Sequence, residues 1–516
     1  MKKMIYLGAL TMATLLSTAC QEEKQNYITV EGGKVQGYES NGLTIYKGIP
    51  FAAPPVGDLR WREPQPVLPW DTILVADHYA TGPIQGEPSP EHSEDCLYLN
   101  IWTPTEKPAE KLPVLVWIYG GGFAFGDTAD PNYDCEALAQ KGGIIMASIN
   151  YRVGPLGFLS LPELSQESAN GVSGNYGLMD QIAGLKWIQR NIEKFGGDPD
   201  RVTIFGESAG GISVSMLCAS PLAKGLFAGA ISQSGGSFGP VDPRSYPGEN
   251  MQALADAEKD GLKLMKSLGV SSLAELRAMD AGAFGARGLG TSGWPIVDGY
   301  VITDDQYKLY GEGKYNDVPV LIGYNSDEGA SFSFGVKDKA SHIASVEARY
   351  GSFAADLLEA YPYTDKDGGK TGRDLTRDAA FGWQTWAWAR LQAETGESKV
   401  FLYYFDQHPD YPKGSEHFGK GSYHGQDVNF VFQHRDNFER PEVDNPLSEI
   451  MGEYWLNFAK HGDPNAEGLP YWPAFDNNAP QSMYLTGPKP FAGPVPSEKG
   501  LWVLDKYFAY KRNAEK

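Results

Sequence analysis

The sequence predicts an α/β fold with a mostly parallel central sheet, helices on both faces and large insertions. Short runs rich in β-branched and aromatic residues recur along the chain, and several are almost continuously apolar, as in strands buried on both faces. Segments with helical periodicity alternate with these runs, which is typical of parallel strands joined by helices. The predicted strands are Val114–Ile118, Ile144–Ile149, Val202–Phe205, Ala228–Ser232, Val320–Gly323 and Val400–Phe405.

Two helices are indicated by the spacing of their apolar residues and by their end signals. Each has apolar side chains along one stripe, an asparagine before its start and glycine at its end. The first is predicted from Leu178 to Ile192, capped by Asn175 and stopped by Gly196-Gly197, and the second from Pro446, capped by Asn445, to the terminator Gly462.

The length and composition favour one large domain, residues 28–516, with long insertions. Of the 516 residues, 41% are hydrophobic and 12% aromatic, and we find no internal repeat or low-complexity tract. The formal net charge of −21 argues against a nucleic-acid partner, because phosphate binding needs basic side chains. After Cys20 only Cys96, Cys135 and Cys218 follow, an odd number that does not support a disulfide framework.

Residues 1–20 have the features of a secretory signal peptide. Two lysines precede the apolar run Met4–Leu16, whose thirteen residues are too short to cross a bilayer. The run leads into small residues before Cys20, a pattern that resembles the lipobox of bacterial lipoproteins. Cys20 would then be the lipidated first residue of an exported protein in the periplasm or at the cell surface, with residues 21–27 as a polar tether and no other membrane contact. The alternative is an ordinary signal peptide cut near Ala19, which would release a soluble protein.

The pentapeptide Gly206-Glu207-Ser208-Ala209-Gly210 is the strongest chemical signal in the chain. It follows directly on the third predicted strand and precedes a helix-like run, which is the context of a nucleophile elbow. Glycines flank such a turn because a strand that bends sharply into a helix crowds its own backbone. Open parallel sheets bind ligands beyond the carboxyl ends of their strands, so Ser208 is expected at the reactive edge.

A serine nucleophile needs a base for its proton and a carboxylate that orients the base. The order serine, acid, histidine leaves six candidate bases, of which His424 is favoured because it lies in a glycine-bounded loop beyond the strand Val400–Phe405. Asp327 and Glu328 follow the strand Val320–Gly323, and their positions do not choose between them. The six histidines are His342, His408, His417, His424, His434 and His461.

Three glycines follow the first predicted strand at the same edge of the sheet. Backbone N–H groups can converge on one oxygen only where no side chain intrudes, so Gly120-Gly121-Gly122 is suited to stabilise a tetrahedral oxyanion. The N–H of Ala209, next to the nucleophile, would be a further donor.

Long segments of the chain resemble the type B carboxylesterase family, which includes cholinesterases and bacterial nitrobenzyl esterases. The resemblance extends from Gly48-Ile49-Pro50-Phe51-Ala52 to Trp472-Pro473. It includes two long signatures, Ser93-Glu94-Asp95-Cys96-Leu97-Tyr98-Leu99-Asn100 and the run from Phe195-Gly196-Gly197-Asp198-Pro199 to Ser208. The resemblance implies an α/β-hydrolase fold and a carboxylic ester hydrolase that needs no metal or cofactor.

Carried over residue by residue, the resemblance chooses among the alternatives above. It implies that Glu328, rather than Asp327, is the orienting acid. The full set that it implies is Ser208 as nucleophile, Glu328 as acid and His424 as base, with Gly121, Gly122 and Ala209 as oxyanion donors and Glu207 and Asp427 in a buried network behind the histidine.

Two departures from the family are visible in the sequence, and the first narrows the range of expected substrates. Cholinesterases have a tryptophan ten residues before the signature cysteine, and this chain has Gly86 there, so choline esters are not expected. No cysteine lies between Cys20 and Cys96, so Cys96 is expected to be a buried free thiol. The expected substrates are small-molecule or glycan-linked esters. Two alternatives are an esterase that deacylates polysaccharide at the cell surface and a non-catalytic adhesion module, against which the complete set of catalytic residues argues.

Overall fold

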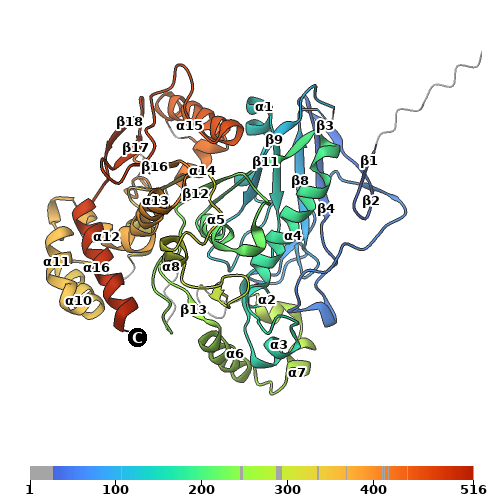
Figure 1. Ribbon diagram of the computed structural model, residues 1–516, viewed down its shortest axis with the longest axis horizontal. Helices are drawn as coiled ribbons and strands as arrows, with labels where there is room; N and C mark the ends of the chain where they lie inside the picture. Colours follow the sequence, from blue (N-terminus) through green and yellow to red (C-terminus); the bar gives the residue numbers. More distant parts are fainter. Residues whose placement is uncertain are drawn as a thin grey trace, which may run out of the picture.

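The predicted strands pair into one large sheet in a computed structural model of the chain (Figure 1). The structure describes residues 27–514 except 106, 244–247, 286–292, 334–335, 368, 409–410, 412, 416–417 and 439. The predicted signal peptide, Cys20, the tether as far as residue 26, and His417 lie outside the described residues.

Eleven strands of the described chain form this sheet, in the order β18-β17-β16-β15-β12-β11-β9-β10-β8-β4-β3. The seven strands from β17 to β10 are parallel, whereas β18 at one edge and β8, β4 and β3 at the other are antiparallel to their neighbours. All six predicted strands are confirmed within a few residues. The bounds are β3 Tyr38–Ser40, β4 Leu43–Pro50, β8 Tyr98–Thr103, β9 Leu112–Ile118, β10 Ile145–Ile149, β11 Gly197–Glu207, β12 Gly229–Gln233, β15 Val320–Asn325, β16 Val400–Phe405, β17 Gln481–Leu485 and β18 Phe491–Pro494.

Helices cover both faces of the sheet, with α4, α5, α8 and α13 on one face and α1 and α15 on the other (Figure 1). Strands between two helical layers are apolar on both sides, which explains the continuous apolar runs in the sequence. The bounds are α1 Glu136–Gly142, α2 Gly154–Phe158, α3 Pro162–Glu167, α4 Tyr176–Asn191, α5 Ala209–Ala219, α6 Leu254–Leu268, α7 Leu273–Arg277, α8 Gln306–Gly311, α9 Gly329–Phe332, α10 Lys339–Tyr350, α11 Ala354–Ala360, α12 Lys370–Arg377, α13 Trp383–Thr395, α14 Gln426–Val431, α15 Pro441–His461 and α16 Glu498–Ala514.

The two predicted helices correspond to α4 and α15, and the start of the second was wrong. Asn175 does precede α4, but its side chain bonds Ile296 and Asp298 instead of capping the helix. Helix α15 begins at Pro441, five residues before Pro446, which lies inside the helix. Proline at the first helical position loses no hydrogen bond, so Pro441 is the better start signal.

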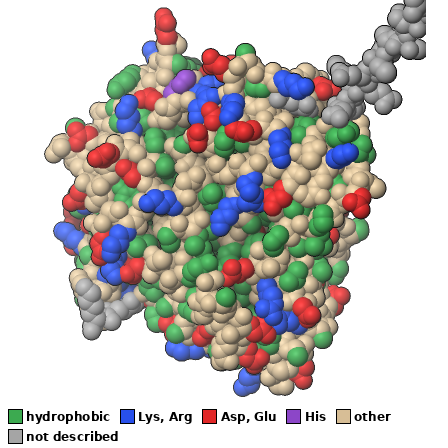
Figure 2. Space-filling view, turned by 45° about the vertical axis from the view of Figure 1, so that its right-hand side comes forward, with side chains coloured by type: hydrophobic (Ala, Val, Ile, Leu, Met, Phe, Trp, Pro, Cys, Tyr) green, Lys and Arg blue, Asp and Glu red, His purple; other side chains and the backbone are tan. Residues whose placement is uncertain are grey.

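Small sheets lie beside the main one, including β1 Ile28–Val30, β2 Gly33–Gln36 and β5 Ile73–Val75 near the start of the described chain. The other short strands are β6 Gly82–Pro83, β7 His92–Ser93, β13 Gln252–Ala253 and β14 Ile296–Val297. No helix among the described residues is both long and apolar enough to cross a membrane. Figure 2 shows acidic and basic side chains interspersed over one face of the molecule, so the acidic excess forms no single-sign patch there.

The cysteines of the described chain, Cys96, Cys135 and Cys218, are free and buried, which confirms the expectation for Cys96.

Candidate active site

The turn between β11 and α5 has the geometry of a nucleophile elbow. Ser208 has φ 56° and ψ −124°, a conformation that costs free energy for a residue with a side chain. Its N–H donates to the Gln233 carbonyl at 2.9 Å, which holds the turn against β12. A Cβ on Gly206 would lie 2.5 Å from the backbone of Gly210, and one on Gly210 would lie 2.0 Å from the Ile118 oxygen. The flanking glycines are therefore required by close packing.

Ser208, His424 and Glu328 meet at the carboxyl edge of the sheet. Nε2 of His424, in the loop between β16 and α14, lies 2.8 Å from Oγ of Ser208. Nδ1 of the same ring lies 3.4 Å from Oε2 of Glu328, just beyond β15. The structure thus brings together the three residues that the sequence singled out, and Glu328 rather than Asp327 faces the imidazole. A base between a hydroxyl and a carboxylate is the arrangement of a serine hydrolase triad.

Two donors hold the buried carboxylate of Glu328. Its Oε1 accepts hydrogen bonds from the Ser234 hydroxyl at 2.5 Å and from the Asn325 N–H at 2.7 Å. Oε2 is left to face His424. Sequence reasoning did not identify Ser234, although it lies directly beyond β12 at the same sheet edge as the other site residues.

Glu207 lies against the imidazole from inside the elbow. Its Oε1 is 3.3 Å from Nε2 of His424 and accepts no hydrogen bond from the described residues. Burial raises the pKa of Glu207 to about 7. Burial also lowers the pKa of His424, but the carboxylates of Glu207 and Glu328 outweigh it and raise this pKa to about 9. The imidazole is thus held between two acidic side chains.

Asp427, at the start of α14, belongs to a second buried layer. Its carboxylate accepts hydrogen bonds from Gln233 at 2.9 Å, Asn325 at 3.1 Å and the Tyr403 hydroxyl at 3.0 Å. Burial raises the pKa of this carboxyl. Asn325 bonds Glu328 through its N–H and Asp427 through its side chain, so this layer supports Glu328. Sequence reasoning missed these donors, which come from three separate strands.

The glycine loop after β9 lies beside Ser208. A Cβ on Gly120 would come within 3.0 Å of Cβ of Ser208, so the loop packs directly against the elbow. Gly121 and Gly122 have φ 98° and 59°, and a Cβ on Gly121 would lie 2.2 Å from the Phe125 oxygen. Ala209 is the first residue of α5, where backbone N–H groups have no partner within the helix.

Two aromatic rings pack on the imidazole and were not identified from the sequence. The ring of Phe332 lies 4.9 Å from that of His424 in an edge contact, and the ring of Phe381 lies 4.8 Å from it with a 33° tilt. Phe332 follows Glu328 by about one helical turn, a spacing that could have indicated it. Phe381 lies in the π-helical segment Asp378–Gly382, and π-helical turns leave no clear sequence signal.

The other candidate histidines of the described chain lie elsewhere. His342 is buried in α10 and bonds the Tyr361 carbonyl, and His461 ends α15. His434 contacts the Asp134 carbonyl.

His408 belongs to a cluster that could hold a metal ion. Its Nε2 lies 3.0 Å from Asp327 and 2.8 Å from Asp406, and the possible ligand atoms of the three residues lie within 4.8 Å of one another. Nζ of Lys370 lies 3.5 Å from Asp327 and already supplies a positive charge there.

Comparisons with known proteins agree with this geometry. The model of the carboxylesterase family matches residues 24–493. Fumonisin B1 esterase from Sphingopyxis macrogoltabida is 35% identical over 528 residues, covering 95% of this chain and 91% of that protein. Para-nitrobenzyl esterase from Bacillus subtilis (strain 168) is 35% identical over 482 residues, covering 89% and 94%.

A solved Geobacillus stearothermophilus carboxylesterase superposes with a TM-score of 0.81 at 31% identity, covering 93% of this chain and 100% of that one. The predicted α/β-hydrolase fold class is therefore confirmed. The chain belongs to the type B carboxylesterase family and is an ester hydrolase of that family.

Proposed function

We propose that this chain hydrolyses carboxylic esters through a Ser208–His424–Glu328 triad and a covalent acyl-enzyme. The observation that carries the proposal is the 2.8 Å contact between Nε2 of His424 and Oγ of Ser208. His424 takes the hydroxyl proton as Oγ attacks the ester carbonyl, and returns it to the departing alcohol. Water, deprotonated by His424, then attacks the acyl-enzyme, and His424 returns the proton to Oγ of Ser208 as the bond between Oγ and the acyl carbon breaks and the acid leaves. Every proton is carried by His424, and the reaction needs no metal or cofactor.

The oxyanion formed in both steps is assigned to the N–H groups of Gly121, Gly122 and Ala209. The positive φ of both glycines, the absence of side chains, and the start of α5 at Ala209 support this role. Loss of one such donor costs about 3 to 4 kcal/mol of barrier. Glu207 and Asp427 complete the supporting network, in which Glu207 stabilises the imidazolium that forms during each step.

The proposed substrates are small-molecule or glycan-linked carboxylic esters. The names of two relatives specify a para-nitrobenzyl ester and fumonisin B1. An ester-library profile measures this preference, and release of acyl groups from acylated xylan fragments tests the polysaccharide alternative.

Replacing Ser208 by Ala tests the mechanism. Turnover of nitrophenyl acetate and covalent labelling by an organophosphate should both disappear, because no other group takes the place of Oγ. The matched control is Ser271→Ala, which removes an exposed hydroxyl that bonds only Glu275 among its described neighbours. Retained labelling in the Ser208 variant would contradict the assignment.

We further propose that the protein is exported and anchored through lipidated Cys20, with residues 21–27 as tether. The lipobox-like pattern before Cys20 supports this location. Detergent partitioning of the wild type should differ from that of Cys20→Ala, and equal partitioning would leave only the soluble, secreted alternative.

A further inference from the structure

Asp327 is the neighbour of Glu328, the proposed acid of the triad. It joins the acid turn, residues 326–328, to the histidine loop, residues 421–425. Its N–H donates to the Ser422 carbonyl at 3.0 Å, and its Oδ2 accepts from the Ser422 N–H at 3.0 Å. Ser422 precedes His424 by two residues. Gly421, with φ 60°, makes room for this pairing, because a Cβ there would lie 2.4 Å from Oδ2 of Asp327. The two reciprocal bonds fix the distance between the loops that carry Glu328 and His424.

Two basic side chains, His408 and Lys370, contact the Asp327 carboxylate on its other side. Nε2 of His408 lies 3.0 Å from Asp327 and 2.8 Å from Asp406 at the end of β16, and 3.1 Å from the Ser326 hydroxyl. Hydrogen bonds to both carboxylates raise the pKa of His408 to about 10. Nζ of Lys370 lies 3.5 Å from Oδ1 of Asp327. The side chain of Asp327 is only 10% exposed. Burial by itself would raise the pKa of this carboxyl, but the hydrogen bond to His408 and the charge of Lys370 outweigh burial and hold the pKa well below its usual value.

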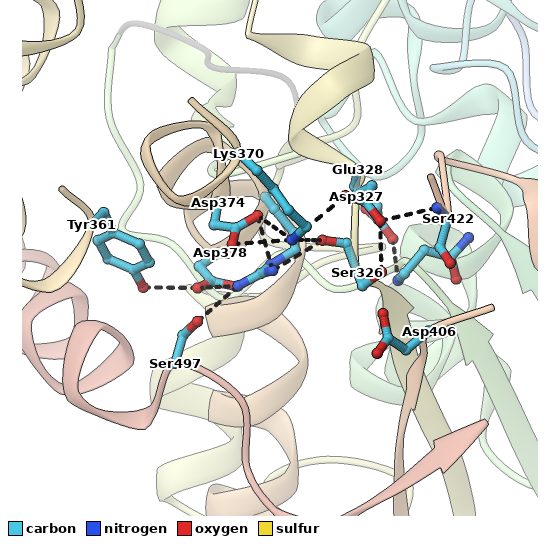
Figure 3. Close-up of polar contacts among 12 residues, drawn as sticks. Ser326, Asp327, Glu328, Tyr361, Lys370, Asp374, Asp378, Asp406, Ser422 and Ser497 are labelled. Carbon is cyan, nitrogen blue, oxygen red and sulfur yellow. Dashed lines mark hydrogen bonds and ion pairs between the residues drawn. The ribbon is translucent and has the colours of Figure 1, made fainter. Parts of the chain in front are cut away.

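Helix α12 holds the backbone of the same turn (Figure 3). Nζ of Lys370 and Nη1 of Arg377 donate to the Ser326 carbonyl at 3.2 and 3.0 Å. Arg377 is almost completely buried and is itself fixed by Asp378, at 2.7 and 2.8 Å. Figure 3 shows Lys370 facing the turn, with Ser422 beyond Asp327. The acid turn is therefore held by α12 at the Ser326 carbonyl and by the histidine loop at Asp327.

The contact between Glu328 and His424 tolerates little movement of the acid turn. Oε2 of Glu328 and Nδ1 of His424 are 3.4 Å apart, at the long end of the hydrogen-bond range. An outward shift of the acid turn by a fraction of an ångström would end the hydrogen bond. A third hydrogen bond to the histidine loop, from the Asn325 side chain to the Tyr423 carbonyl at 2.9 Å, keeps this loop from moving independently.

We propose that Asp327, held by His408 and Lys370, is a positioning residue that sets the contact between Glu328 and His424. The proposal rests on the triad proposed above. Asp327 contacts neither the hydroxyl of Ser208 nor the imidazole of His424, so it acts through the acid turn and the histidine loop. The sequence offered Asp327 only as a rival acid, and the structure gives it this different role.

Asp327→Ala tests the proposal with nitrophenyl acetate. Because a misplacement of about 1 Å can cost about 100-fold in rate, we expect kcat to fall by about 10- to 100-fold and KM to change less than about twofold. The acid limb of the pH profile of kcat/KM should move to lower pH, because His424 loses part of the support of Glu328. Asp327→Asn keeps an acceptor for the Ser422 N–H and should lie between this variant and the wild type.

The matched control is Asp77→Asn, which breaks an exposed histidine–aspartate pair, His78 Nδ1 to Asp77 at 2.7 Å, and should leave kcat unchanged. Wild-type kcat in Asp327→Ala would overturn the proposal, and so would a lowered kcat with an unmoved acid limb. If Asp327→Ala does not fold, His408→Gln replaces it: kcat should fall several-fold at constant KM, and an unchanged kcat would overturn the proposal.

The activity of Ser208→Ala distinguishes failure of the proposed triad from failure of the positioning role. Activity in Ser208→Ala would remove the proposed function, whereas an inactive Ser208→Ala beside a wild-type-like Asp327→Ala would remove only the positioning role.

Discussion

Replacing Glu207 by Gln should move the acid limb of esterase activity to lower pH. Only neutral His424 can accept the Ser208 proton, so kcat/KM rises as the pH increases through the pKa of this histidine. That pKa is raised to about 9, against burial, by the neighbouring carboxylates, of which Glu207 is the strongest by charge. Without that carboxylate, the neutral base is present at lower pH.

The size of the shift follows from the 3.3 Å between Oε1 of Glu207 and Nε2 of His424. Two unit charges at this separation interact by about 5 kcal/mol at an effective dielectric constant of about 20. Because the pKa of Glu207 is about 7, its carboxylate is almost fully ionised near pH 9, where the limb of the wild type lies. One pKa unit corresponds to about 1.4 kcal/mol, so the limb should move down by roughly three pH units.

The assay is kcat/KM for nitrophenyl acetate from about pH 5 to about pH 10, which reports the pKa values of the free enzyme. The control is Glu193→Gln, which removes an exposed carboxylate paired with Lys111 and should leave the limb in place. The optimum rate should fall as well, since Glu207 stabilises the imidazolium. An unmoved limb, or a shift to higher pH, would refute the role given to the Glu207 carboxylate.

Two further substitutions test the triad and the elbow. Glu328→Gln should lower kcat by about 10⁴-fold, as loss of the orienting carboxylate does in other serine hydrolases, and a loss below about tenfold would show that another acid orients His424. Gly210→Ala places a Cβ 2.0 Å from the Ile118 carbonyl oxygen. Because this oxygen belongs to the backbone, no change of side-chain conformation relieves the clash, and thermal unfolding should occur at a much lower temperature. Gly311→Ala, whose Cβ meets only Leu391 at 4.0 Å, is its control, and equal melting temperatures would contradict the packing argument.

The sequence was informative where one local pattern determines the structure. The buried strands of the sheet are largely apolar, and the elbow depends on glycines that lie within its own five residues. Ser208, Glu328 and His424 could be placed at one edge because each follows a strand of the same parallel sheet. For these features, local composition and the geometry of parallel strands carry almost all of the information.

Other features depend on side-chain directions or on residues far apart in the chain. The choice of Glu328 over Asp327 follows from side-chain directions in one turn, which the sequence showed only through the family resemblance. Ser234 acts on Glu328 across two strands, and Phe381 reaches His424 from a π-helical turn. The early start of α15 was missed because Pro446 looked like a first residue although Pro441 precedes it.

The three cysteines of the described residues are buried, which makes these thiols inert to thiol reagents while the domain is folded. Burial raises the pKa of Cys96, Cys135 and Cys218, and the thiolate is the reactive form. Modification therefore requires that the core opens, so its rate follows opening of the domain, whereas organophosphate labelling of Ser208 follows the intact site. One sample treated with both reagents separates loss of chemistry from loss of structure, using only the nucleophiles that the chain already has.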